Sequence, residues 1–284
     1  MGKVRWGTSD LVKNVPEESA PTGPSAFVVD PSGKAHILDR AASRVQVYAQ
    51  KNGRWLVERT VALPPGEYID LETDGASGYA LLDADDRQAV IFVDGSGKET
   101  ASLRLAGAHI PEVGYVRALR LRGSEVWVQL ADYSLVLIGE GTNAVAERTV
   151  QKGLDNGGGK RLVPVVKRPN DVRVGFLGGD TVGALATLSF DLPVARISAL
   201  EVAPDGSTYV AVVLEEDPKP GGAQSRVEHL LVVIDAKGKE VVRADLEVDE
   251  SGLGCNRPLR LGADGKLYQM RLSDDGVDLT RFVR

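Results

Sequence analysis

The strongest constraint on the fold of this chain is a unit of four short predicted strands, which recurs at intervals of about 46 residues. Turns of the Asp/Pro/Gly type separate the strands, and the copy at 25–64 is the clearest. Apolar residues fall at every second position, as at Val126, Val128 and Leu130, which is the period of a β-strand. The sequence therefore predicts an all-β, six-bladed β-propeller with four-stranded blades, formed by a single domain, 1–284. The blades are predicted to start near Ser25, Tyr68, Arg117, Arg161, Arg196 and Arg257.

The last unit indicates how the propeller would close. It has only three predicted strands, at 257–284, whereas the chain begins with a strand-like segment at 3–12. If this segment supplies the outer strand of the last blade, no blade is left with an open edge. We therefore expect a ring closed by the N-terminal strand. Five or seven blades remain the alternatives, because the fourth unit, 161–191, is the least regular.

One segment also carries a family resemblance. Residues 23–49, GPSAFVVDPSGKAHILDRAASRVQVYA, combine an apolar strand, an Asp-Pro-x-Gly turn, a strand ending in Asp and an Arg-Val-Gln-Val-Tyr strand. This pattern resembles an NHL repeat, and shorter matches recur at 205–212 and 264–270. The resemblance implies a six-bladed propeller. Most proteins of that group are binding platforms and a minority of related propellers are enzymes.

Composition and charge exclude several classes of protein. Lys and Arg number 34 against 40 Asp and Glu, and the net charge of −6 argues against nucleic-acid binding. The single cysteine, Cys255, cannot form an intrachain disulfide or a CxxC metal site. No apolar stretch reaches the ~18 residues of a transmembrane segment. We expect a monomer that is either cytoplasmic or, if an export signal has been removed, periplasmic or envelope-associated in a bacterium.

The candidate binding site is a cationic channel mouth. In a propeller the loops that lead into the inner strands share one face, and four of the six blade starts predicted above are arginines. Converging arginines would bind a small anionic ligand or an acidic protein segment. The candidate ligand-binding residues are Tyr68, His109, Arg117, Lys160, Arg161, Arg196, Asn256 and Arg257. In the alternative interpretation, each arginine pairs with a nearby carboxylate, such as Glu67, Glu112, Asp155 or Asp180.

No motif assigns a catalytic residue, a metal or a cofactor. His36 and His229 lie in predicted strands and are interpreted as structural, and no GxSxG motif occurs. Gluconolactonase-like propellers hold a divalent cation on Glu, Asn and Asp, whereas the corresponding positions in this chain are mainly cationic. The sequence therefore favours a non-enzymatic binding or scaffold protein. A gluconolactonase-like, metal-dependent hydrolase is the alternative.

Overall fold

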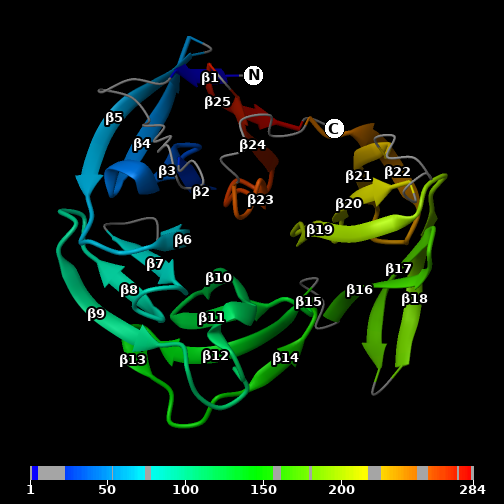
Figure 1. Cartoon of the computed structure of the whole chain (residues 1–284), viewed down its shortest axis with the longest axis horizontal. Coiled ribbons are helices and arrows are strands. Elements are labelled where there is room, and N and C mark those ends of the chain that lie inside the picture. The colour runs from blue at the N-terminus through cyan, green and yellow to red at the C-terminus, as the bar shows by residue number, and fades with distance from the viewer. Residues whose placement is uncertain are drawn as a thin grey trace. The chain divides into compact units, whose positions relative to one another are not determined.

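Strands form almost all of the regular structure in the computed structural model. It describes residues 2–5, 23–52, 54–73, 78–155, 161–178, 181–216, 225–247, 255–273 and 275–282. The strands form six antiparallel sheets (Figure 1), which are the blades of a six-bladed β-propeller, so the predicted fold class is confirmed. Two 3₁₀ helices, η1 (Arg40–Ala42) and η2 (Val113–Tyr115), are the helical elements of the described ranges. The chain divides into two compact units, Met1–Gln151 with Asp249–Arg284, and Lys152–Val248.

The first unit holds four sheets. Three of them have four strands that pair in a single unbranched row. The first sheet runs in the order β2 (Pro24–Val29), β3 (Ala35–Asp39), β4 (Arg44–Lys51) and β5 (Arg54–Ala62). The second runs in the order β6 (Tyr68–Thr73), β7 (Tyr79–Asp83), β8 (Ala89–Val93) and β9 (Glu99–Arg104). The last runs in the order β23 (Leu259–Leu261), β24 (Leu267–Ser273), β25 (Gly276–Arg281) and β1 (Gly2–Arg5). The third has five strands, with β13 and β14 both on β12: β10 (Val116–Arg122), β11 (Glu125–Leu130), β12 (Ser134–Glu140), β13 (Asn143–Ala144) and β14 (Val150–Lys152).

The N-terminal strand occupies the outermost position of the last sheet. β1 pairs antiparallel with β25, with Gly2 opposite Leu279 and Arg5 opposite Gly276, and the two strands lie side by side in Figure 1. The prediction that the N-terminus completes the last blade is therefore confirmed for these residues. The remainder of the predicted segment, 6–12, lies outside the described residues.

The second unit holds two four-stranded sheets. The fourth sheet of the chain consists of β15 (Leu154–Asp155), β16 (Arg161–Arg168), β17 (Asp171–Gly178) and β18 (Thr181–Ser189). The fifth consists of β19 (Val194–Val202), β20 (Thr208–Glu215), β21 (Val227–Ile234) and β22 (Glu240–Asp245). Arg161 thus opens the second strand of its sheet, and the prediction that a blade starts there is wrong by one strand. The reason is that the two residues of β15 are too few to show a strand period.

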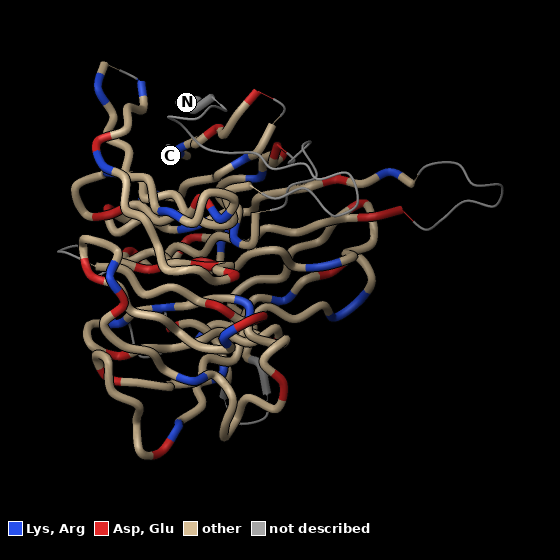
Figure 2. The backbone as a smooth tube through the Cα atoms, turned by 60° about the vertical axis from the view of Figure 1, so that its left-hand side comes forward, with Lys and Arg blue, Asp and Glu red and all other residues tan. Residues whose placement is uncertain are grey.

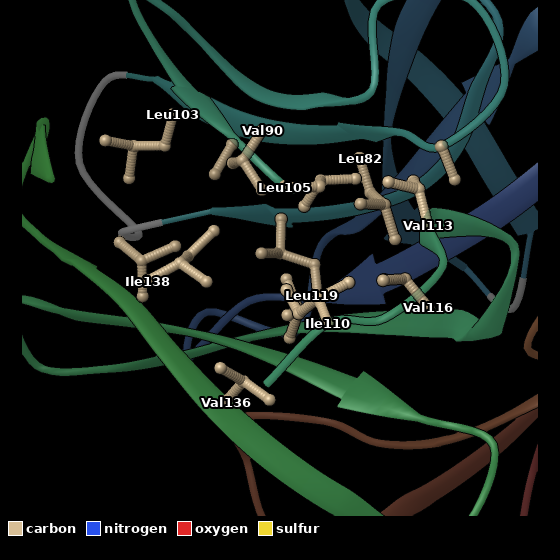
Figure 3. Close-up of a cluster of buried hydrophobic side chains, with 14 residues drawn as sticks. Leu82, Val90, Leu103, Leu105, Ile110, Val113, Val116, Leu119, Val136 and Ile138 are labelled. Carbon is tan, nitrogen blue, oxygen red and sulfur yellow. The ribbon is translucent and has the colours of Figure 1, made fainter. Parts of the chain in front are cut away.

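The core of the first unit lies between neighbouring sheets. Figure 3 shows the cluster between the second and third sheets, where Leu82 and Val90 pack with Leu119 and Val136. A similar cluster joins the first and second sheets, and another joins the first and last. Each cluster takes side chains from two sheets, so each blade is stabilised by the next.

The hairpin turns use aspartate and glycine as the sequence predicts. Asp30 Oδ1 accepts hydrogen bonds from the backbone N–H and the hydroxyl of Ser32, and from the backbone N–H of Lys34. Gly33 has φ +80°, a left-handed conformation that glycine adopts without steric cost. The turn Asp94–Lys98 repeats this arrangement in the second sheet, with Gly97 at φ +87°.

Candidate functional site

Four charged side chains gather among the first strands of the sheets in the first unit, and we call them the central ion cluster. Asp70 and Glu72 lie on β6, Arg260 lies on β23, and Arg257 precedes β23. Arg257 Nη1 lies 2.9 Å from Asp70 Oδ2, and Arg260 Nη1 lies 3.1 Å from Asp70 Oδ1. Glu72 Oε1 accepts a bond from Arg260 Nη2 and lies 3.5 Å from Arg257 Nη1. Two positive charges and two negative charges therefore cancel.

Asp70 is the centre of this cluster. Its side chain is 0% exposed, and each carboxylate oxygen accepts two hydrogen bonds. Oδ1 accepts from the backbone N–H of Leu71 and from Arg260, and Oδ2 accepts from the backbone N–H of Leu119 and from Arg257. Four donors are about the full acceptor capacity of an ionised carboxylate. Asp70 therefore holds β6, β10 and the segment around β23 together.

Arg260 extends the same role to β2. Its Nη1 donates to the backbone carbonyls of Phe27 and Leu71, both at 2.8 Å. Glu72, its other partner, has a pKa raised by burial and by the nearby Asp70 charge, while Arg260 and Arg257 act in the opposite direction. The cluster is thus a buried, cross-linked part of the scaffold, whose stability depends on every charge having its partner.

Arg257 accordingly does not present its guanidinium to a ligand in the way that the channel-mouth hypothesis requires. Its Nη1 donates to Asp70 and to the backbone carbonyl of Leu119, and its side chain is 11% exposed. Arg257 pairs with carboxylates, as in the alternative interpretation. The partners are Asp70 and Glu72 rather than the carboxylates suggested by sequence proximity, of which Glu67 binds Arg40.

Tyr68 packs in the core of the first unit. Its side chain packs in the cluster between the first and second sheets and is 1% exposed. Burial raises the pKa of its phenol. Tyr68 is the first residue of β6, where the sequence places the start of the second blade, and its part in ligand binding stays a prediction.

Asn256 and Arg117 are brought together at the start of β10. Asn256 Nδ2 donates to the backbone carbonyl of Arg117 at 2.8 Å, and the Asn256 N–H donates to the Ser25 carbonyl. The Arg117 side chain is exposed. His109 is exposed as well, with φ +66° beside the bridge between Gly107 and Ile110. Arg117 is thus an exposed cation on a backbone that neighbouring loops hold in place.

The remaining predicted residues belong to the second unit. Arg161 lies directly opposite Asp155 across β15 and β16, which places unlike charges side by side. Arg196 is exposed on β19, and the pKa of His229 is lowered by burial and by the Arg196 charge. Lys160 lies outside the described residues. Convergence of Arg161 and Arg196 with Arg117 stays a prediction.

His36 is structural, as the sequence predicts. Its side chain is buried, with Nδ1 2.9 Å from the Tyr79 hydroxyl and Nε2 3.1 Å from Asp30 Oδ2. Burial lowers the pKa of His36, and the charges of Arg59 and Lys34 add to this, while Asp30 opposes it. The neutral imidazole therefore links the first hairpin turn to β7.

The described residues contain no metal cluster, and acidic and basic residues alternate along their backbone. Within these residues, no three His, Cys, Asp or Glu side chains come close enough to hold a metal ion. No helix in the same ranges is long and apolar enough to span a membrane. Figure 2 shows basic and acidic positions interleaved along the chain rather than segregated.

These features define the chain as a six-bladed β-propeller protein with a charge-neutral cluster at its first strands. No protein-family model and no curated protein matches it. Among solved structures, the chain is similar to KlHsv2 with loop 6CD replaced by a Gly-Ser linker (12% identity, TM-score 0.44, covering 92% of this chain and 97% of that one). It is also similar to BamB from Moraxella catarrhalis (13%, 0.43, 99% and 91%) and to the C-terminal WD40 domain of Sif2 (14%, 0.43, 92% and 70%). At such identities and TM-scores these likenesses carry no argument about ligands or partners.

Proposed function

We propose that this protein is a non-enzymatic binding or scaffold propeller that contacts an acidic protein segment or a small anion through Arg117. The observation that supports this best is the contrast between Arg117 and Arg257. Arg257 is neutralised inside the central ion cluster, whereas Arg117 carries an exposed guanidinium on a backbone held by Asn256. A fixed, exposed arginine can bind a carboxylate or phosphate through two parallel hydrogen bonds.

The same cluster weighs against the hydrolase alternative. A metal-dependent hydrolase needs carboxylate oxygens that are free to bind the cation. Both oxygens of Asp70 are occupied by N–H donors, and Glu72 is bound by Arg260. A cation at this position would have to displace two guanidinium groups.

Titration of phosphate, citrate and a hexaglutamate peptide tests the binding proposal. We expect the Arg117→Ala variant to bind the peptide more weakly than the unmodified protein. Arg54→Ala, which removes another exposed arginine from β5, is the matched control and should bind normally. Equal binding by all variants, or none by any protein, would contradict the proposal.

A metal series tests the non-enzymatic part. Ca²⁺, Mg²⁺, Mn²⁺ and Zn²⁺ at millimolar concentration should leave the melting temperature unchanged. A ligand at 100 times its Kd contributes about 2.7 kcal/mol, which a melting assay detects easily. A clear upward shift with one of these ions would instead support the hydrolase alternative.

A further inference from the structure

A separate cleft lies on the first unit, between the first and last sheets. Its volume is about 480 Å³, within the range of small-molecule sites. The turn after β2, the hairpin of β4 and β5, and the strands β24 and β25 form its walls. None of the channel-mouth residues lines it, so its occupancy is independent of the function proposed above.

The charges in this cleft favour an anion. Three cationic side chains line it, those of Lys34, Lys266 and Arg281. Lys34 is paired with Glu58, whose Oε1 lies 2.6 Å from Nζ, and Lys266 is paired with Asp264. Asp264 is already occupied, because Oδ2 accepts a bond from the Tyr268 hydroxyl at 2.8 Å and lies 3.1 Å from Lys266 Nζ. These contacts hold the pKa of Asp264 below its usual value, although burial opposes them. With Glu58 and Asp264 both counted, the charge of Arg281 remains as the positive excess of the cleft at neutral pH.

Tyr268 adds a fixed aromatic surface to the cleft. Its side chain is 4% exposed, and burial together with Asp264 raises its pKa to about 12. The phenol therefore stays protonated and keeps donating to Asp264, rather than adding a negative charge to the cleft. Because the ring is almost fully buried in the core cluster between the first and last sheets, it supports the wall of the cleft, and Trp55 is left as the main aromatic contact for a ligand.

Trp55 supplies an aromatic wall and a hydrogen-bond donor. The indole lines the cleft and packs on the core cluster between the first and last sheets. Its Nε1–H is buried and makes no hydrogen bond to the described residues. A buried donor without an acceptor is unfavourable, and a ligand oxygen within reach would relieve it.

We propose that this cleft binds a small aromatic acid. The ring would pack against Trp55, and the carboxylate would be bound by Arg281, with Lys266 beside it. Arginine at the rim matches the planar, two-oxygen geometry of a carboxylate. The combination of an aromatic wall with an excess of positive charge favours this class over a neutral ring or a purely polar anion.

Isothermal titration calorimetry with three probes tests the ligand class. Benzoate carries both features, acetate lacks the ring and benzamide lacks the charge. We expect benzoate to bind, and the other two to bind about tenfold more weakly or not at all. Raising the salt concentration should weaken benzoate binding, because exposed charges are screened. Equal binding of benzamide and benzoate, or no binding of benzoate, would overturn the proposal.

Matched variants test the position of the site. The turns Asp30–Lys34 and Asp94–Lys98 have the same hydrogen bonds, but only Lys34 lines the cleft. Lys34→Ala should therefore weaken benzoate binding and Lys98→Ala should not. The double variant Lys266→Ala with Arg281→Ala should lose about tenfold or more in affinity. Unchanged affinity in the double variant would place the ligand elsewhere and refute the assignment.

Discussion

Replacing Asp70 by asparagine tests the central ion cluster most directly. The substitution keeps the shape of the side chain but removes its charge, so Arg257 and Arg260 lose a buried counterion. It also replaces one carboxylate oxygen, which accepts hydrogen bonds, by an N–H₂ group. This group would then face two of the four N–H donors that bind Asp70 in the unmodified protein. Removing one partner of a buried pair costs about 3–5 kcal/mol. At about 2–4 °C per kcal/mol for a unit of this size, the melting temperature should fall by about 6–20 °C.

Tryptophan fluorescence is the appropriate assay for this loss. Trp55 and Trp127, the tryptophans among the described residues, both belong to the first unit, so their signal follows the unit that contains Asp70. A urea titration gives the midpoint and the slope together, and an unchanged slope means that the compactness of neither state has changed. The control is Glu67→Gln, which removes the half-exposed partner of Arg40 and should cost at most about 1 kcal/mol. A loss below about 1 kcal/mol for Asp70→Asn would show that the cluster does not hold the strands together.

Three further predictions follow from other parts of the structure. Deleting residues 1–12 removes β1 from β25 and leaves an open edge, so a lower melting temperature or aggregation in size-exclusion chromatography is expected; an unchanged melt would contradict the pairing. Because the pKa of His36 is lowered in the folded protein, the unfolded chain takes up a proton before the folded one does as the pH drops below 6.5. The free energy of unfolding, measured by urea titrations at several pH values, should therefore fall below pH 6.5, and His36→Gln should reduce this dependence on pH. In urea titrations, Gly97→Ala should lower the free energy of unfolding more than Gly33→Ala does. A Cβ at Gly97 would lie 1.8 Å from the Ala62 carbonyl oxygen, whereas a Cβ at Gly33 would meet no atom within 4 Å. Equal losses for the two variants would show that the backbone around Gly97 moves to relieve this contact.

The strand pattern predicted the fold because it repeats and is local. The alternation of apolar residues and the Asp–Gly turns are visible within short windows, and Gly33, Gly206 and Gly265 all have the positive φ that such turns require. The fourth blade was misplaced because β15 has two residues, and so carries no period of its own. A first strand of only two residues can be located only from its pairing in the folded sheet.

The candidate site was less predictable because its contacts are distant in the chain. Arg257 and Asp70 are 187 positions apart, and Arg260 and Asp70 are 190 apart. The sequence does contain a signal, since Asp70 and Arg260 are charged residues between apolar neighbours of predicted strands. Charged residues at inward-facing strand positions are rarely buried without a partner. That signal identifies buried ions but not their pairing, which depends on how the sheets meet.

The pairing of β1 with β25 has a consequence for synthesis on the ribosome. β1 is synthesised before the strands of the other sheets, and its partner β25 is added only after they have been made. During translation the N-terminal segment therefore remains without its strand partner, while the sheets from β2 onward can already form from neighbouring strands. A nascent chain that stalls before β25 would carry an unpaired N-terminal strand and an incomplete last blade, and both are targets for chaperones and proteases. The last sheet can thus be completed only after β25 has been synthesised.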